Sequence, residues 1–582
     1  MGSKAFKQAG IQTKSLRGKP SPTAVQARTV PWSSAGPVTR SLSGQLQQAV
    51  GLHAAGDRSA AEGLYRQVLE VDPNHPDALH LLGLVEHQKK NFQSAADLIE
   101  RAIDIDRSKA AFFMDLGSAY RGLGNLRKAA ESYIESLRLN PQSAEAYVNL
   151  GNAFKDDQQF EDAVTCYRQA IELKPGLIGA HENLGNVLRR MCRFSDALIP
   201  YRRALDLDPD RPSTYYNLAM LMSDLGKLDE ALACYDRCLE LQIEFPDRVL
   251  FLQGLIELLR GDFNAGWDRY ERRWGNPDHD TPNRSYAQPL WNGEKLSQGG
   301  LFVWGEQGIG DEIMFAGLLP DVLRTGNRCI LECDSRLQPL FGRSFPAIEV
   351  VSRPIDERTI DFAAHIPSGS LPRIFRSTAD AFRATPSFYL VADSAQRQVL
   401  RDDYYDGRPL VGLAWKTKNK KSGHLRSINL AEFAPLFSDG DLRPVNLQYG
   451  DSVELAGEAE GAGFPLLIDC KVDQLADMDI FAAQIAALDL VITIDNSTAH
   501  LAGALGVPVW LLLPFAPDWR WQLNREDSPW YPTMRIFRQQ AVSEWKPVLD
   551  RVRHALRQFK ACRSSGDEER EPLPLCHCRE NW

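Results

Sequence analysis

Small and aromatic residues recur along the first half of the chain with one spacing of 34 residues. One register holds Gly83, Gly117, Gly151, Gly185 and Ala219, and a second holds Ala61, Ala95, Ala129, Ala163, Ala197 and Ala231. A third holds Tyr65, Ile99, Tyr133, Tyr167, Tyr201 and Tyr235, and a fourth holds Pro73, Pro141, Pro175 and Pro209. Four registers with one period predict an array of structural repeats.

Each register has a structural reason in a pair of packed helices. Small residues let two helices cross closely, and we expect the aromatic ring to fill the groove between neighbouring helix pairs. The proline follows the second helix, which it cannot continue. The pattern resembles the tetratricopeptide repeat over residues 42–243, and a diverged helix pair follows at 248–274. We therefore expect a right-handed solenoid with a concave surface.

Asparagines in the predicted first helices follow the same period. They are Asn149, Asn183 and Asn217, here called the amide row, and Asp115 holds the equivalent position one repeat earlier. A primary amide both donates and accepts hydrogen bonds, so this row is able to bind the backbone of an extended peptide. The repeats resemble those of protein O-GlcNAc transferases, in which such a row holds the acceptor protein. Alternatively, the amides only satisfy local backbone or neighbouring repeats.

After Trp274 the pattern changes to strands that alternate with helices. Residues 276–298 are rich in Pro, Asn, Gly and Ser, which predicts a linker. Continuous apolar runs then predict buried parallel strands at Leu301–Trp304, Cys329–Glu332, Leu410–Trp415, Pro444–Leu447, Leu488–Ile494 and Val507–Leu513. The alternation indicates two Rossmann-like α/β units that divide near residues 392–408.

Ligands of such sheets bind beyond the carboxyl ends of the strands, and three segments lie there. In the first, a glycine-rich turn with Gly308 and Gly310 follows a strand and lets a ligand approach the backbone. Asp311 stands at the start of the next helix, where it is the best-placed carboxylate for a general base. Alternatively, Asp311 only caps that helix.

The second segment follows the run 410–415 and is cationic. Its charged residues are Lys416, Lys418, Lys420, Lys421 and Arg426. Such a cluster at a strand end is able to neutralise a pyrophosphate. An ordinary solvated basic loop explains the middle three lysines well, but it explains the strand-terminal Lys416 and Arg426 less well.

The third segment begins where a predicted buried strand ends at Asp495. Asn496 or Ser497 can cap the short helix that follows, and the backbone N–H groups of its first turn form an anion site. Ser497 and Thr498 add hydroxyl donors. His500 is able to orient the loop or reach a phosphate, or else it is a satisfied histidine of the core.

Together these segments resemble the ADP-heptose:lipopolysaccharide heptosyltransferases of glycosyltransferase family 9. The resemblance implies a GT-B fold with an acceptor half at residues 299–400 and a nucleotide-sugar half at residues 401–562. It makes Asp311 the catalytic base of an inverting transfer. With the strand-end argument, it assigns the nucleotide sugar to Gly308, Gly310, Lys416, Arg426, Asn496, Ser497, Thr498 and His500.

More closely still, the chain resembles bacterial tetratricopeptide proteins with a fused domain similar to family 9. Further signatures of that group are Gly261-Asp262-Phe263, Gly266-Trp267, Tyr270-Glu271, Arg273-Trp274, Pro517-Asp518-Trp519-Arg520-Trp521 and Asp527-Ser528-Pro529-Trp530-Tyr531-Pro532. Residues 299–395 are short for a full Rossmann unit, which leaves room for the solenoid to complete the acceptor pocket. The run 519–521 either stacks on the nucleotide base or belongs to the core.

Composition is that of a soluble globular protein: of 582 residues, 43% are hydrophobic and 25% are charged. We find no apolar run long enough for a membrane span or a secretory signal. Ten scattered cysteines fit reduced thiols in a cytoplasm, where we expect the protein. Residues 1–41 predict a disordered basic arm and residues 563–582 a disordered tail.

The arm holds seven Lys or Arg and no Asp or Glu within residues 1–40, although the net charge of the chain is −9. The acidic remainder disfavours nucleic-acid binding. We expect no cofactor and no metal, because GT-B enzymes generally neutralise the leaving diphosphate with protein donors. Cys576-His577-Cys578 is a weak zinc signal, since it offers three ligands within three residues and no fourth.

The sequence therefore predicts an α-solenoid over residues 42–275 followed by an α/β GT-B fold. The predicted function is transfer of a sugar from a nucleotide sugar to a hydroxyl group, on a protein or peptide held by the repeats. One alternative is a glycolipid or lipopolysaccharide sugar transferase whose repeats recruit partners. The other is a non-catalytic protein-interaction scaffold.

Overall fold

The computed structural model describes residues 37–356, 360–418 and 423–564. The chain divides into two compact units, Met1–Leu221 and Met222–Trp582. Most of the predicted basic arm and of the predicted tail, with Cys576-His577-Cys578, lies outside the described residues, as do Lys420 and Lys421.

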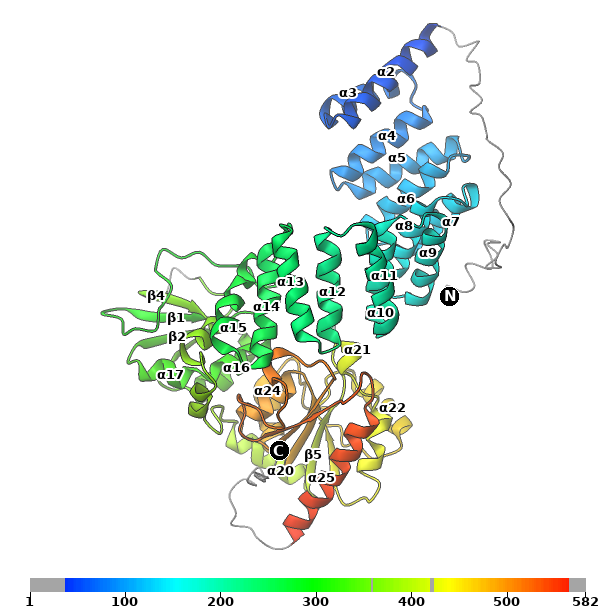
Figure 1. Cartoon of the computed structure of the whole chain (residues 1–582). Coiled ribbons are helices and arrows are strands. Elements are labelled where there is room, and N and C mark those ends of the chain that lie inside the picture. The colour runs from blue at the N-terminus through cyan, green and yellow to red at the C-terminus, as the bar shows by residue number, and fades with distance from the viewer. Residues whose placement is uncertain (1–36, 357–359, 419–422, 565–582) are drawn as a thin grey trace. The chain divides into compact units, whose positions relative to one another are not determined.

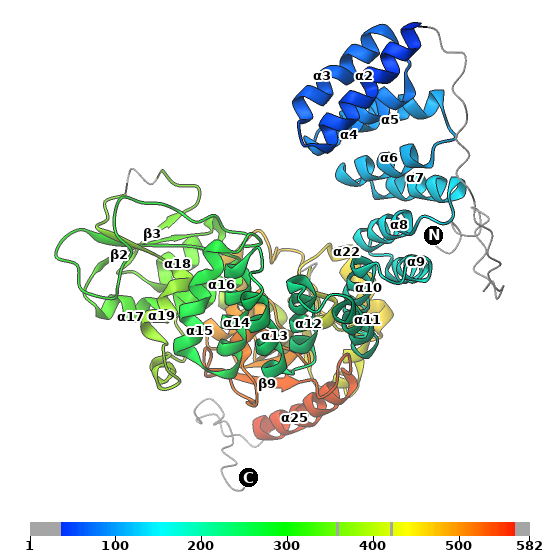
Figure 2. The same cartoon turned by 45° about the horizontal axis from the view of Figure 1, so that its top comes forward.

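The first unit is a solenoid of antiparallel helix pairs (Figure 1). Its helices are α2 (Pro37–Ala54), α3 (Arg58–Val71), α4 (Pro76–Gln88), α5 (Phe92–Ile105), α6 (Ala110–Gly122), α7 (Leu126–Leu139), α8 (Ala144–Asp156), α9 (Phe160–Leu173), α10 (Ile178–Arg190), α11 (Phe194–Leu207) and α12 (Pro212–Asp224), which carries the boundary. Several begin at a capping side chain: Asp57, Asn125 and Ser143 each accept a hydrogen bond from the amide three residues further on. The predicted repeat architecture is confirmed, and Figure 2 shows the same pairs from a second direction.

The small and aromatic registers meet within each repeat. A Cβ added at Gly117, Gly151 or Gly185 would lie 2.6, 2.7 or 2.5 Å from the ring of the tyrosine 16 residues further along. That ring therefore packs between the two helices of its own repeat, whereas we expected it between neighbouring pairs. In two repeats its hydroxyl also donates to an asparagine of the same helix pair, at 2.8 Å to Asn152 and 2.7 Å to Asn186.

The second unit contains the remaining helices and both sheets. Its helices are α13 (Leu228–Glu240), α14 (Pro246–Arg260), α15 (Phe263–Tyr270), α16 (Ile309–Ala316), α17 (Leu319–Arg324), α18 (Gln338–Ser344), α19 (Leu371–Phe375), α20 (Ser394–Tyr404), α21 (Gly423–Arg426), α22 (Ser452–Ala462), α23 (Met478–Ala486), α24 (Ser497–Ala504) and α25 (Lys546–Ser564). Short 3-10 turns are η1 (Glu271–Gly275), η2 (Ser335–Leu337), η4 (Ser368–Ser370), η5 (Asp380–Ala384), η6 (Leu430–Leu436) and η7 (Trp519–Trp521).

Two parallel sheets give this unit its α/β architecture. The first has the order β3-β2-β1-β4, with β1 (Gly300–Trp304), β2 (Arg328–Cys333), β3 (Glu349–Ser352) and β4 (Ala364–Pro367). The second has the order β6-β5-β7-β8-β9, with β5 (Leu410–Ala414), β6 (Arg443–Asn446), β7 (Leu490–Ile494), β8 (Val509–Leu513) and β9 (Met534–Arg538). All neighbouring strands run parallel. The six predicted strands are present, and β3, β4 and β9 were not predicted.

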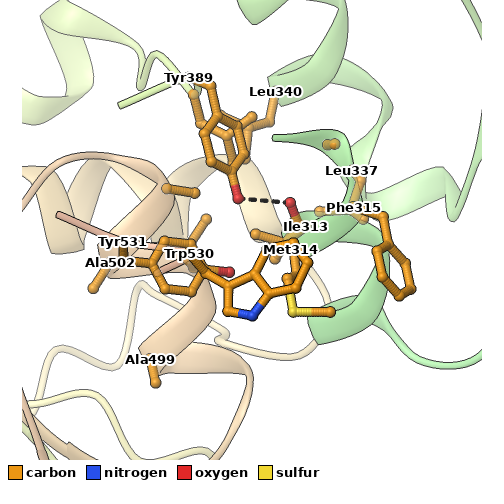
Figure 3. Packing of buried hydrophobic residues seen from close by; sticks show 14 of the residues in the cluster. Ile313, Met314, Phe315, Leu337, Leu340, Tyr389, Ala499, Ala502, Trp530 and Tyr531 are labelled. Carbon is orange, nitrogen blue, oxygen red and sulfur yellow. Dashed lines mark hydrogen bonds between the residues drawn. The ribbon is translucent and has the colours of Figure 1, made fainter. Parts of the chain in front are cut away.

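One hydrophobic core joins the two sheets through α16 and α24. Figure 3 shows Ile313 of α16 and Ala502 of α24 in one packed cluster, with the Tyr389 hydroxyl donating to the Ile313 carbonyl at 2.8 Å. Gly310 makes this approach possible, because a Cβ there would lie 3.1 Å from the His500 ring. The first turns of the two helices therefore face each other.

The diverged helix pair packs with the sheets and not only with the repeats. Trp267 of α15 is buried, and its indole N–H donates to the Arg376 carbonyl at 2.9 Å. Its ring meets that of Trp519 edge to face at 5.3 Å. The compact division at Met222 therefore lies well before the predicted end of the repeats at residue 275, and α14 and α15 contribute to the core of the second unit.

Candidate functional site

The strand order reverses its direction once in each sheet. In the first sheet the reversal lies between β1 and β4, and in the second it lies between β5 and β7. Ligands of open parallel sheets bind outside the carboxyl ends of the strands at such switch points. The three predicted segments follow β1, β5 and β7, so the topology brings each of them to the edge where a ligand is expected.

Asp311 lies in the first turn of α16, and both of its carboxylate oxygens are engaged. Oδ2 accepts a hydrogen bond from the Gly308 amide at 3.3 Å, which is the helix cap that we considered as an alternative. Oδ1 forms an ion pair with Arg520, which comes from the other sheet's half of the unit. Asp311 is therefore a helix cap and also an ion-pair partner that connects the two halves of the unit.

This contact opens a line of alternating charges, here called the charge chain: Asp311, Arg520, Asp518, Arg426 and Asp495. Arg520 Nη1 lies 2.6 Å from Asp518 Oδ1, and Arg426 Nη2 lies 3.7 Å from Asp518 Oδ2. Arg426 Nη1 lies 2.7 Å from Asp495 Oδ2 at the end of β7. The charge chain therefore connects the start of α16 to the residue just before α24.

Burial makes these charges interact strongly. The exposed fraction of the Arg520 side chain is 13%, and that of Asp495 is 6%. Burial alone would raise the pKa of Asp518, but the guanidinium groups of Arg520 and Arg426 outweigh it and hold that pKa below its usual value. The two carboxylates beside Arg520 overcome its burial and raise its pKa. Asp518 and Arg520 are therefore both charged near neutral pH.

The beginning of α24 has the geometry of a capped helix. Asn496 is its N-cap, and the Asn496 Oδ1 accepts from the Ala499 amide at 3.2 Å and from the Thr493 hydroxyl at 3.1 Å. The first amides of the helix precede its internal hydrogen bonds, as an anion site requires. Ser497 is half-buried beside them, whereas Thr498 is only 2% exposed, so Ser497 is the more accessible hydroxyl.

His500 lies in the core. Its ring stacks on Trp521 at a centroid distance of 5.1 Å, and its Nδ1 lies 2.9 Å from the Tyr531 hydroxyl. Burial and the nearby Arg520 lower the pKa of His500 to about 4, so the ring is neutral at pH 7. These contacts match the core alternative. Trp519 and Trp521 are likewise buried in the core cluster, which is the second of the two interpretations of that run.

Lys416 lies at the strand end but outside the charge chain. Its Nζ is 2.5 Å from Glu458 Oε2, and its side chain is 44% exposed. Its backbone amide donates to the buried Gln448 Oε1 at 2.8 Å. Among the described residues of the predicted cationic segment, Arg426 is thus the one that joins Asp311 in one network, through Arg520 and Asp518.

The loop between β1 and α16 is held by the diverged helix pair and the linker. Glu306 is buried and pairs with the buried Arg273, with Nε to Oε2 at 2.9 Å and Nη2 to Oε1 at 2.8 Å. Gln307 has a φ of 64°, and its backbone N–H donates to the Thr281 hydroxyl at 2.8 Å. Its side-chain amide donates to the Tyr270 hydroxyl at 2.5 Å. These contacts fix the loop that carries Asp311.

Six of the predicted site residues lie at one helix junction or in one network of ion pairs. The structure brings together Asp311, Gly310, Arg426, Asn496, Ser497 and His500 at the junction of α16 and α24 or in the charge chain. The sequence interpretation missed the roles of Arg520, Asp518 and Asp495 as ion-pair partners. The signal that could have pointed to Arg520 and Asp518 was the Asp518-Trp519-Arg520-Trp521 motif, in which two charges alternate with two tryptophans.

The amide row lies in the first unit, on α8, α10 and α12, and each side chain is half-buried. At the equivalent position, Asp115 accepts from His80 of the preceding repeat at 2.7 Å. The contact between neighbouring repeats that we weighed as an alternative is therefore present for Asp115. Peptide binding by the three asparagines stays a prediction.

Metal ligands and membrane spans were also sought in the described ranges. Residues 37–356, 360–418 and 423–564 contain no group of three or more His, Cys, Asp or Glu able to hold a metal ion. Among the helices of these ranges, none is long and apolar enough to cross a bilayer.

Comparison with known families identifies the repeats. Models described as TPR repeat match residues 117–158 and 151–191. Models described as tetratricopeptide repeat match residues 46–110 and 201–233. The chain carries tetratricopeptide repeats. These matches cover much of the predicted array, and its role is therefore one of protein interaction.

Among curated proteins, the chain is similar to Protein FlbA of Caulobacter vibrioides, with 33% identity over 331 residues. The match covers 53% of this chain, and the chain spans about half (55%) of that relative's length. Solved structures similar in fold include a tetratricopeptide repeat protein from Parabacteroides merdae, at 17% identity, with 40% of this chain and 92% of that chain covered and a TM-score of 0.36. Another is pilF of Pseudomonas aeruginosa, at 16% identity, with 35% and 94% covered and a TM-score of 0.32.

Proposed function

We propose that the second unit is a glycosyltransferase of GT-B type, which moves a sugar from a nucleotide-sugar donor to a hydroxyl group. The acceptor hydroxyl belongs to a protein that the tetratricopeptide repeats hold. The observation that carries this proposal is the junction of α16 and α24, at which the Asp311 carboxylate and two guanidinium groups share one partly buried network beside a helix start. That combination offers a base and an anion site within one cleft.

The chemistry follows from these groups. Asp311 accepts the proton of the acceptor hydroxyl, and the hydroxyl oxygen forms a bond to C1 of the donor sugar from the face opposite the leaving group. The bond between C1 and the diphosphate oxygen breaks, and the nucleoside diphosphate departs with the electron pair. Arg520, Arg426 and the first amides of α24 stabilise its negative charge. The configuration at C1 is inverted.

The remaining predicted residues have supporting positions in this proposal. Ser497 lies at the helix start with an accessible hydroxyl, and Asn496 shapes that turn. Gly310 lets α16 approach His500. Lys416 contributes only if a ligand replaces Glu458 as its partner.

Turnover of a panel of UDP-, GDP-, ADP- and dTDP-linked sugars by the full chain tests the proposal, with released nucleoside diphosphate as the readout. Asp311→Asn should slow release by about 10²–10⁴-fold, the range for removal of a general base. A matched control is Asp479→Asn, because Asp479 also lies in a first helical turn and pairs with an arginine of the other half, Arg343. Equal rates for wild type and Asp311→Asn would remove Asp311 from the mechanism.

A second outcome separates the classes of function. If no nucleotide sugar binds to the full chain in titration calorimetry, the protein is an interaction scaffold and the transferase proposal is wrong. If sugar is transferred to a lipid-linked acceptor and never to protein, the repeats recruit partners and do not present the substrate.

A further inference from the structure

The charge chain suggests how a donor prepares the site, and this step rests on the function proposed above. We propose that Arg520 exchanges partners: it holds Asp311 when the site is empty and moves to the diphosphate of the donor when a nucleotide is bound. The Asp311 carboxylate is then released to accept a proton only when the donor is in place.

The engaged state of Asp311 is the first argument. One oxygen accepts from the Gly308 amide at 3.3 Å, and the other pairs with Arg520. Each Asp311 oxygen therefore already has one donor, and the oxygen that does not cap the helix faces the guanidinium where a substrate hydroxyl would approach. A general base in this position therefore needs its arginine to be drawn away.

The second argument is that Arg520 can leave Asp311 without losing its place. Its Nη1 lies 2.6 Å from Asp518, and its guanidinium lies over the Trp519 ring at 4.4 Å from the centroid. These two contacts anchor the cation whichever group its other nitrogen meets. Because a guanidinium has five N–H donors in a fixed fork, one nitrogen can pair with Asp518 while the other meets a phosphate oxygen.

The third argument is the count of charges. The charge chain has three carboxylates and only two guanidinium groups, so it already carries an excess of negative charge. An anionic ligand gains a guanidinium partner here only if one carboxylate gives up its ion pair. Asp311 is the carboxylate on the opposite half, and it is 19% exposed, whereas Asp495 is 6% exposed beneath the start of α24. Asp311 is therefore the group that the ligand replaces.

Competition between Asp311 and the diphosphate for Arg520 predicts that replacing Arg520 and replacing Asp311 change nucleotide affinity in opposite directions. Binding of UDP, GDP and ADP is measured by titration calorimetry on the full chain. Arg520→Gln should weaken binding by about 10–100-fold, because a charge-assisted hydrogen bond to phosphate is lost. Asp311→Asn should tighten binding several-fold, since it removes both the competitor and one negative charge. In the double variant the gain should shrink to what the lost negative charge alone provides, because no arginine remains to be released.

The controls separate this inference from the proposed function and from misfolding. Tighter binding by Asp311→Asn cannot come from damaged structure, and Asp479→Asn should bind as wild type. Should wild type bind a nucleotide while Asp311→Asn binds equally or more weakly, the exchange is refuted and the transferase proposal stands. Should no nucleotide bind to wild type or to Asp311→Asn, both the proposed function and the exchange fail.

Discussion

The Arg273–Glu306 pair provides the sharpest stability prediction, because neither side chain has any exposed surface. Two hydrogen bonds of 2.9 and 2.8 Å join them, and Arg273 also meets the Ser370 hydroxyl and Glu271 Oε1 at 2.8 Å. Burial alone would raise the pKa of Glu306, but the charge of Arg273 outweighs it and holds that pKa at about 2. Replacement of Arg273 by Met leaves a buried carboxylate without its main partner.

The expected magnitude follows from burial. Removal of one partner of a buried ion pair costs about 3–5 kcal/mol, so Arg273→Met should destabilise the second unit by that amount. Glu306→Gln should cost less, because Arg273 retains Glu271. The double variant should cost less than the sum of the two, since it leaves no uncompensated charge. The matched control is Arg328→Met, which breaks a pair of 2.7 Å with Glu349 on the same sheet, each 52% exposed, and should cost below about 1 kcal/mol.

Tryptophan fluorescence during urea unfolding is a selective assay for this unit. Ten of the twelve tryptophans lie between Trp267 and Trp545, and none lies between residues 33 and 266. The signal therefore reports the second unit and leaves the repeats of the first unit silent. If Arg273→Met and Arg328→Met shift the unfolding midpoint equally, burial does not set the strength of these pairs and the reasoning fails.

Three further predictions concern the helices and the site. Gly185→Ala should speed hydrogen exchange in α10 and α11, because the added Cβ meets a tyrosine ring and overpacking costs about 1–3 kcal/mol. The control Gly179→Ala, whose Cβ would lie in open space on α10, should slow exchange slightly. The same direction of change for both would contradict this. Folding lowers the pKa of His500 to about 4, so the stability that its neutral ring contributes is fully present above pH 6.5. Up to about 3 kcal/mol of the free energy of unfolding is lost as pH falls toward 4. His500→Gln should flatten this pH dependence of the unfolding midpoint, and an unchanged slope would argue against it. Alanine at all three positions of the amide row should lower modification of a protein acceptor without changing donor hydrolysis, and unaffected modification favours a lipid-linked acceptor.

The fold could be predicted wherever one element has one dominant pattern. The 34-residue period predicts the helix pairs, and continuous apolar runs predict six strands, of which all but the edge strand β6 are internal to a sheet. Three strands lack such a pattern. The edge strand β3 begins at the exposed Glu349, β4 contains His365 and ends at Pro367, and the edge strand β9 carries Arg535 and Arg538. Edge positions tolerate charge and proline, which conceals a strand from a search for apolar runs.

From the sequence, only those site residues could be predicted that follow a strand within one half. Asp311 and Arg426 follow from that rule, because a residue after a parallel strand lies at the ligand edge. Their connection does not follow, since Arg520 is 209 residues from Asp311 and meets it only when the two halves dock. The aromatic residues beside Arg520 mark the segment but not its contact with Asp311, because a buried tryptophan and a base-stacking one look alike in a sequence.

The ion pairs of the arginines determine how readily their positive charge is available to a ligand. From the sequence, the segment from Lys416 to Arg426 is predicted to neutralise a pyrophosphate with its positive charges. In the structure, Lys416 is paired with Glu458 and Arg426 with Asp495, so an anion must compete with a carboxylate at each of them. A monoanion gains one contact and breaks one, and it has no advantage over the group that it displaces. A diphosphate carries more charge and more acceptor oxygens than one carboxylate, so in the exchange that we propose it replaces Asp311 at Arg520 and also meets Arg426. Selectivity for a diphosphate over a simple phosphate would then arise from the carboxylates that form ion pairs with the arginines, and not from the arginines alone.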